Sequence, residues 1–229
     1  MKKHVPSSEY KFVITGGPTR EWIDPVRFIS NPSSGKMGVA LTNAAAEISR
    51  NVLFIHGPMH PSDYSSVKVP MIGIETTIQM RDAVIESLSP HTILIMSAAP
   101  ADYSPSMMSD RKIKKGKSTL TIELIKTPDI LSDIMELRKH DPSIEPLFIT
   151  GFAAETHNIE EYAKEKITRK NLDIICVNDV TVEGAGFGVN TNIITIYDST
   201  GNKAVFPKMT KDKIAEEIIK AICFKIDGV

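Results

Sequence analysis

Short apolar runs, rich in β-branched residues, alternate along this chain with longer segments of helical periodicity. The runs occupy residues 10–15, 51–56, 92–97, 146–151 and 172–178. Runs of this kind, without regular polar alternation, are typical of strands buried on both faces of a parallel sheet. The alternation therefore predicts an α/β fold in which a mostly parallel sheet has helices on both faces.

The segments between these runs carry apolar stripes with helical spacing. Helices are predicted over residues 37–48, 76–88, 128–140 and 157–171. Pro128 stands near a favoured first-turn position of the third helix, and Asn158 with Glu161 forms a variant of the capping box in the fourth. At 229 residues, the chain suits one large α/β domain, or one domain with an appendage.

Two segments depart from the alternation. Residues 111–127 begin with a cationic stretch and turn near Gly116. Their second half is predicted to be a strand, because Leu120, Ile122 and Leu124 alternate with polar residues, so the segment predicts a projecting β-hairpin arm. Residues 192–222 predict a strand, a turn at 199–202, a short second strand and a final amphipathic helix.

Polar loops follow four of the predicted parallel strands. These loops are residues 16–38, 98–105, 151–156 and 178–190. In open α/β sheets, ligands bind beyond the carboxyl ends of the strands. We therefore expect the four loops to gather on one rim and to form the functional site there.

The first of these loops has the composition of an anion site. Residues 33–35, Ser-Ser-Gly, stand where a helix begins, so backbone N–H groups and two hydroxyls are expected to face the rim. Plain N-capping by one serine is the simpler alternative. Capping does not account for Arg27, Asn31 and Lys36 in the same loop, so a phosphate-binding role remains attractive.

Spacing excludes two familiar phosphate-binding motifs. A P-loop needs Ser or Thr after its lysine, whereas Met37 follows Lys36 and Ser30 occupies the first glycine position. A dinucleotide fingerprint needs GxGxxG and an acidic residue near the end of the next strand. Here residues 16–19 read Gly-Gly-Pro-Thr, and the second strand ends Ile-His-Gly, so the glycine pattern and the acidic residue are both missing.

Further candidates follow the other strands, each with a structural alternative. Asp102 suits a ribose hydroxyl or a metal-bound phosphate, or merely caps a turn. Lys166 and Lys170 are spaced to reach one anion, or to stabilise a helix C-terminus. Phe152 could stack on a base or belong to the core. The cationic stretch that includes Lys112 could reach a triphosphate or remain a solvated charged face.

Composition narrows the range of partners. A formal net charge of −1 gives no reason to expect nucleic acid or an anionic membrane as a partner. Cys176 and Cys223 form no CxxC pair, which disfavours a disulfide framework or a zinc site. No apolar segment follows the N-terminal lysines or reaches transmembrane length, so we expect a cytoplasmic protein.

Six motifs in register extend over most of the chain. They read ITGGPTREWIDPVRFISNPSSGKMG, AAPADY, KIKK, TPDIL, GFAAET and RKNLDIICVNDV. Together they resemble phosphopantothenate–cysteine ligase (phosphopantothenoylcysteine synthetase) of the bacterial CTP-dependent type, an enzyme of coenzyme A biosynthesis. The resemblance runs from about Phe12 to Asn192 and weakens in the last strand and helix.

The resemblance implies a single doubly wound, Rossmann-like domain over residues 1–229. It implies a homodimer in which the arm is a flap over an active site at the subunit interface. It also implies a two-step ligation with Mg²⁺. The carboxylate of 4′-phosphopantothenate attacks the α-phosphorus of CTP and releases pyrophosphate, and the amine of L-cysteine then attacks the acyl-cytidylate and expels CMP.

Roles are carried over residue by residue. Catalytic roles fall on Asn31, Lys112 and Arg27. With the phosphate-binding loop included, nucleotide binding falls on Ser33, Ser34, Gly35, Ser97, Ala98, Ala99, Asp102, Lys112, Pro128, Asp129, Ile130, Leu131, Phe152, Lys166 and Lys170. The metal ligands are not assigned.

Many bacterial members of this family carry a flavin-dependent decarboxylase domain ahead of the ligase. Because the first strand begins near Tyr10, we expect no bound flavin and a phosphopantothenoylcysteine decarboxylase on a separate chain. Pro100 stands where a small aliphatic residue is commoner, and the preference for CTP over ATP rests on the resemblance.

Two other functional classes stay open. An NAD-dependent oxidoreductase is opposed by the missing GxGxxG motif. A catalytically silent nucleotide-binding module is opposed by the joint presence of Asn31 and Lys112.

Overall fold

The computed structural model describes residues 10–114, 116, 119–155, 159–179, 186 and 188–227. Its main sheet has eight strands in the order β12-β11-β10-β9-β6-β1-β4-β5. They are β1 (Lys11–Gly16), β4 (Val52–His56), β5 (Met71–Gly73), β6 (Thr92–Met96), β9 (Leu147–Glu155), β10 (Ile174–Asp179), β11 (Thr191–Asp198) and β12 (Lys203–Thr210). The strands from β5 across to β10 pair in parallel, and β11 and β12 are antiparallel. The predicted doubly wound, mostly parallel fold is confirmed.

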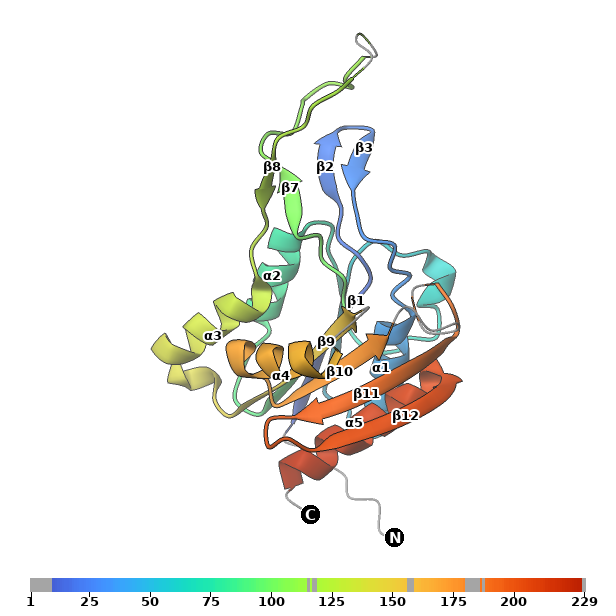
Figure 1. The fold of residues 1–229 in the computed structure, drawn as a ribbon, viewed down its shortest axis with the longest axis vertical. Helices are drawn as coiled ribbons and strands as arrows, with labels where there is room; N and C mark the ends of the chain where they lie inside the picture. Colours follow the sequence, from blue (N-terminus) through green and yellow to red (C-terminus); the bar gives the residue numbers. More distant parts are fainter. Residues whose placement is uncertain are drawn as a thin grey trace.

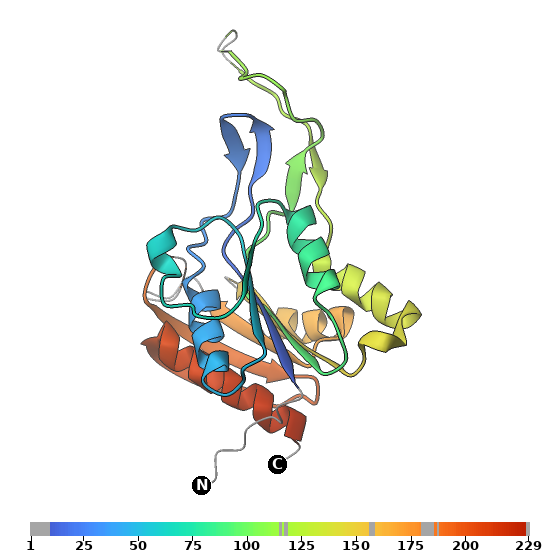
Figure 2. The ribbon, with the colours of Figure 1, turned by 180° about the vertical axis from the view of Figure 1, so that it is seen from behind.

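Helices cover both faces of this sheet (Figures 1 and 2). They are α1 (Lys36–Ala46), α2 (Thr77–Glu86), α3 (Ile130–His140), α4 (Ile159–Lys170) and α5 (Lys211–Asp227), with short 3₁₀ turns at Pro61–Asp63 and Pro142–Ile144. Helices α1 and α5 share one buried cluster with Phe12 and Ile14 of β1, and α2, α3 and α4 share the other with Val13. Alternate residues of β1 thus point into two separate cores, as expected for a strand buried on both faces.

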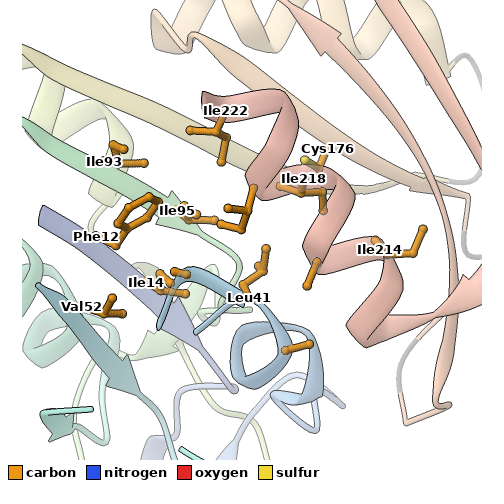
Figure 3. Packing of buried hydrophobic residues seen from close by; sticks show 14 of the residues in the cluster. Phe12, Ile14, Leu41, Val52, Ile93, Ile95, Cys176, Ile214, Ile218 and Ile222 are labelled. Carbon is orange, nitrogen blue, oxygen red and sulfur yellow. The ribbon is translucent and has the colours of Figure 1, made fainter. Parts of the chain in front are cut away.

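The packing of α1 and α5 against the sheet fixes the central strands in place. Leu41 of α1 and Ile218 of α5 lie over the strands that carry Phe12, Ile14 and Ile95 (Figure 3), and all five side chains are fully buried. Complete burial of an aliphatic or aromatic side chain stabilises a fold by about 1.5–3 kcal/mol. The carboxyl ends of these strands therefore form a rigid base for the loops beyond them.

Helix α1 approaches β1 unusually closely. A Cβ atom on Gly38 would lie 2.7 Å from the Cα atom of Gly16 and 3.0 Å from the carbonyl oxygen of Thr15. No ordinary side chain fits at such distances, because interiors are already close-packed. The two glycines let the start of α1 lie directly beside the end of β1.

The helix starts differ in part from the prediction. Pro128 is not in the first turn of α3, because Asp129 is the N-cap residue and its carboxylate accepts from the Ser132 N–H at 3.1 Å. An aspartate side chain at the N-cap position satisfies a free N–H group of the first turn, so the helix begins at Ile130, two residues after Pro128. A capping box that the sequence analysis did not single out begins α2, between Thr76 and Gln79. The expected capping box at Asn158 lies outside the described residues.

Four described strands, β2, β3, β5 and β7, were not predicted, and the arm differs from its prediction. Strand β5 forms one edge of the sheet, and β2 (Glu21–Asp24) pairs with β3 (Arg27–Ile29) inside the loop after β1. Among the described residues of the arm, only β8 (Leu124–Lys126) is a strand, and it pairs with β7 (Tyr103–Pro105), which precedes the expected start of the arm. The strand predicted in the second half of the arm is therefore present but shorter than expected, because β7 pairs only with residues 124–126.

The β2–β3 hairpin and the arm project side by side from the same end of the molecule (Figures 1 and 2). They are joined by backbone contacts, such as the hydrogen bond from Ser109 N–H to the carbonyl of Ile23 at 3.0 Å. Both extend beyond the carboxyl ends of the parallel strands. The predicted projecting arm is thus present, with its turn near Gly116 only partly within the described residues.

Candidate functional site

Two adjoining cavities lie at the carboxyl ends of the parallel strands, with volumes of about 460 and 410 Å³. We call them the α3 cavity and the α1 cavity after the helices that begin at them. Four predicted site residues line both cavities. They are Ala98, Asp102, Phe152 and Lys166.

The remaining predicted residues divide between the two cavities. The α3 cavity adds Pro128, Asp129, Ile130, Leu131 and Lys170. The α1 cavity adds Asn31, Ser33, Ser34, Gly35, Ser97 and Ala99. The loop predicted at residues 151–156 is wrong, because residues up to Glu155 belong to β9, and Phe152 reaches the site from this strand. The segments after β1, β6 and β10 still meet with β9 and the starts of α1 and α3 at one composite site, as the position of the strand ends requires.

The first turn of α1 is open to a ligand in the α1 cavity. Gly35 is the N-cap residue, with a φ angle of 72°, and no side chain caps the helix. This left-handed conformation favours glycine. Neither Ser33 nor Ser34 caps the helix, so the simple capping alternative is wrong, and Ser33 Oγ accepts from Gly35 N–H at 3.3 Å. Uncapped N–H groups at a helix N-terminus are suited to bind an anion.

Asn31 joins the loop before α1 to the loop after β6. Its Nδ2 atom donates to the carbonyl oxygens of Pro100 at 2.9 Å and Ala99 at 3.3 Å. A further bond between the same loops runs from Ala99 N–H to the carbonyl of Gly17 at 2.9 Å. The amide of Asn31 therefore holds in register two loops that line the α1 cavity.

Lys166 and Lys170 both reach the α3 cavity from α4, as their spacing predicts. Lys170 is 8% exposed and forms an ion pair with Asp129, and it donates to Ser132 Oγ at 2.5 Å. Burial opposes the charge of Asp129, but the hydrogen bonds from Lys170 and Ser132 outweigh it and lower the pKa of this carboxyl group. Lys166 Nζ donates to the carbonyl of Phe152 at 3.2 Å.

Arg27 and Lys112 line neither cavity in the described structure. Arg27 instead forms an ion pair with Asp24 inside the β2–β3 hairpin, and Lys112 lies exposed on the arm. The structure therefore places these two expected catalytic residues together on the projecting hairpins, apart from the other site residues.

Asp24 connects the hairpin to the arm. Its side chain is fully buried, and its Oδ2 atom accepts from Ile113 N–H at 3.1 Å, while Arg27 Nη2 donates to the carbonyl of Ile113 at 3.0 Å. Hydrogen bonds from the Arg27 guanidinium, above all, hold the pKa of Asp24 far below its usual range. Because Ile113 directly follows Lys112, this contact fixes the position of that lysine.

Three polar residues that the sequence analysis did not identify also line the α1 cavity, namely Asn178 at the end of β10, Asn192 and Lys211. Lys211 begins α5, and Asn192 lies at the start of β11. Both belong to the C-terminal part of the chain, where the resemblance weakens. No local sequence signal marks them, because only the antiparallel return of β11 and β12 brings them to the site.

The described residues contain no group of three or more His, Cys, Asp or Glu side chains that could hold a metal ion by themselves. Among the same residues, no helix has the length and apolar character needed to cross a membrane.

The fold and site together define a doubly wound α/β protein with a composite ligand site at the carboxyl edge of its sheet. A family model described as the C-terminal domain of DNA/pantothenate metabolism flavoproteins matches residues 7–225. The chain belongs to this family.

Individual relatives agree with that assignment. The chain is 42% identical over 214 residues to the coenzyme A biosynthesis bifunctional protein CoaBC of Vibrio cholerae, covering 93% of this chain and 52% of that protein. It is 43% identical over 210 residues to CoaBC of Bacillus subtilis, covering 92% of this chain and 50% of that protein. The chain thus spans about half the length of the curated relatives it matches.

A solved structure is also similar over nearly its whole length. The crystal structure of the C-terminal domain of a CoaBC protein is 33% identical, with a TM-score of 0.74, and the match covers 96% of this chain and 97% of that one. The doubly wound fold expected from the sequence is therefore the fold of this family.

Replacing Asp24 by Ala should loosen the arm, because it removes the acceptor of the Ile113 N–H and the partner of Arg27. We expect hydrogen exchange at Ile113 to accelerate by at least about tenfold, while exchange in β1 stays unchanged. Asp110→Ala, which removes an exposed carboxylate from the same arm, is the matched control. Unchanged exchange at Ile113 would show that the arm does not depend on Asp24.

Proposed function

We propose that this protein is a phosphopantothenate–cysteine ligase that joins 4′-phosphopantothenate to L-cysteine through an acyl-cytidylate formed from CTP. The observation that carries the proposal is the pair of adjoining cavities that share Asp102, Phe152 and Lys166. A two-substrate activation needs two binding sites side by side, so that the reacting atoms meet with little loss of entropy. The names of the relatives, which place them in coenzyme A biosynthesis, support the same reaction.

We assign CTP to the α3 cavity. Residues 128–131 and Lys170, which the family resemblance associates with the nucleotide, line this cavity, whereas Ser97 and Ala99 from the same set line the adjoining α1 cavity. Lys170 is held at the cavity by its ion pair with Asp129 and would meet a phosphate group without moving far. Phe152, which lines both cavities, provides an apolar surface between the two substrates.

We assign the phosphate of 4′-phosphopantothenate to the α1 cavity. The uncapped N-terminus of α1 and the hydroxyls of Ser33 and Ser34 would bind it. The carboxylate at the other end of this substrate would then extend toward the shared residues. There it would attack the α-phosphorus of CTP and displace pyrophosphate.

The described residues fit a magnesium ion that is held mainly by the triphosphate. Mg²⁺ commonly binds through one or two carboxylates and substrate phosphates, and Asp102 offers an exposed carboxylate that lines both cavities. When bound, the ion would neutralise charge on the departing pyrophosphate.

Cysteine completes the reaction in this proposal. Its amine attacks the acyl carbon of the acyl-cytidylate. The bond between that carbon and the phosphate oxygen breaks, and CMP leaves. Asn31 positions the loops on which this intermediate lies, through its bonds to the carbonyls of Ala99 and Pro100. The steps of this ligation use no flavin.

A second copy of the chain would complete the site. The hairpin and the arm expose large apolar side chains, among them Val26 (54%), Met107 (84%) and Ile125 (50%). Exposed apolar side chains concentrated in one region are typical of an interaction surface. We propose a homodimer in which this surface is covered and the arm brings Lys112, with Arg27 nearby, to a site that contains the two cavities.

The proposal is tested by measuring pyrophosphate release. We expect release from CTP only when 4′-phosphopantothenate is present, and phosphopantothenoylcysteine when L-cysteine is added. ATP in place of CTP tests the base preference. A silent nucleotide-binding module would bind CTP without releasing pyrophosphate, and an oxidoreductase would instead transfer hydride to NAD. Either result would reject the ligase.

Lys112→Gln should lower kcat/KM for pyrophosphate release by at least about 100-fold, because it removes a cation that meets the triphosphate when the arm closes. The fold and the dimer should stay intact, as checked by circular dichroism and light scattering. Lys114→Gln changes a second exposed lysine of the same arm and should retain activity. If both variants are equally active, Lys112 is a solvated surface residue that does not meet the triphosphate.

Asn31→Asp should stop the reaction at the intermediate. The change keeps the volume but places a negative charge against the carbonyl oxygens of Ala99 and Pro100 and near the acyl-cytidylate. We expect at most about one pyrophosphate released per site, with acyl-cytidylate accumulating on the enzyme. A quenched reaction with labelled CTP resolves CTP, CMP and the intermediate. Product formation near the wild-type rate would show that Asn31 is only a loop residue.

A further inference from the structure

The first residue of α5, Lys211, places its side chain at the α1 cavity. It lines that cavity together with Ser33, Ser34 and Gly35, although it lies more than 170 residues further along the chain. The residue is only 8% exposed, and its Nζ atom donates to the carbonyl oxygen of Gly186 at 3.3 Å. Lysine at such low exposure is rare in proteins unless its charge has a partner.

No carboxylate in the part of the chain that the structure describes forms an ion pair with Lys211. Within those residues, the one hydrogen bond of its side chain goes to a neutral carbonyl group. Burial, and then the nearby charge of Lys36, lower the pKa of the Lys211 ammonium group. A buried charge that lacks a partner costs free energy in the ligand-free protein. An anion in the α1 cavity would remove that cost.

The cavity offers a second group with an unmet requirement. The Oδ1 atom of Asn178, which lines the α1 cavity at the end of β10, is buried and accepts no hydrogen bond within the described structure. Buried polar atoms are nearly always satisfied in native proteins. A ligand that suits this cavity therefore combines an anionic group, for Lys211 and the open helix end, with a hydroxyl or amide donor for Asn178.

We propose that Lys211 is a phosphate-binding residue that makes the α1 cavity select a phosphorylated acid over its unphosphorylated form. The inference rests on the proposed function, in which the substrate is 4′-phosphopantothenate. That molecule combines the phosphate with hydroxyl and amide donors, whereas pantothenate lacks only the phosphate. CTP binds to the cations of the α3 cavity, so its affinity does not depend on Lys211.

The test uses Lys211→Met, which keeps the length of the side chain and removes its charge. Lys213→Met is the matched control, because Lys213 lies on the same helix, is 67% exposed and pairs with Glu216. Isothermal titration calorimetry measures the binding of 4′-phosphopantothenate, pantothenate and CTP to each protein, and thermal unfolding is followed without ligand. Pyrophosphate release by the wild type is measured in parallel.

We expect Lys211→Met to bind 4′-phosphopantothenate at least 30-fold more weakly, as is common when one partner of a buried charge pair is truncated. Its affinities for pantothenate and CTP should change less than threefold, and Lys213→Met should match the wild type. The melting temperature of Lys211→Met without ligand should be equal to or above that of the wild type, because an uncompensated buried charge is gone.

Other results overturn the inference. Unchanged affinity for 4′-phosphopantothenate, with an active wild type, would show that Lys211 does not bind the phosphate. Loss of CTP affinity would place the cation at the nucleotide, and a lowered melting temperature would make Lys211 a structural anchor of α5. If the wild type neither binds 4′-phosphopantothenate nor releases pyrophosphate with it, the ligase proposal fails, and this inference fails with it.

Discussion

The close approach of α1 to β1 is the constraint on which the site depends. Gly16 and Gly38 face each other without side chains, so the N-terminus of α1 lies directly at the end of the central strand. Gly57, which directly follows the neighbouring strand β4, is under the same constraint. A Cβ atom at this position would lie 1.6 Å from the carbonyl oxygen of Pro18. Any residue with a side chain at these positions would push the loop after β1 away from the rim.

Electrostatics then divides the rim into two parts. In the α3 cavity, Lys170 is already paired with Asp129, so the position of its side chain is fixed before a ligand arrives. In the α1 cavity, the charge of Lys211 and the N–H groups of α1 lack such partners within the described structure. A site that is preorganised for charge in this way stabilises charged ligands more than water does. The projecting hairpins carry the remaining expected residues and are held together by Asp24.

The sequence predicted what local patterns determine. Strands such as β1 and β6, which are buried on both faces, are marked by their apolar runs. Because ligands of open α/β sheets bind beyond the carboxyl ends of the strands, these runs also located the site. Strand β5 was missed because its three residues are exposed and carry no such pattern. The pairing of β7 with β8 was misplaced because it joins Tyr103 to Lys126 across the whole arm. Lys211 was missed for the same reason, since the return of the last two strands is non-local.

The most direct test of the two-cavity account is a pair of crystal structures, one with CTP and one with 4′-phosphopantothenate. We predict that the triphosphate lies in the α3 cavity near Lys170 and residues 128–131. The phosphate of 4′-phosphopantothenate should lie at the N-terminus of α1, against Ser33 and Ser34. If the triphosphate instead occupies the N-terminus of α1, or if both ligands compete for one cavity, the division of substrates between the two cavities is wrong.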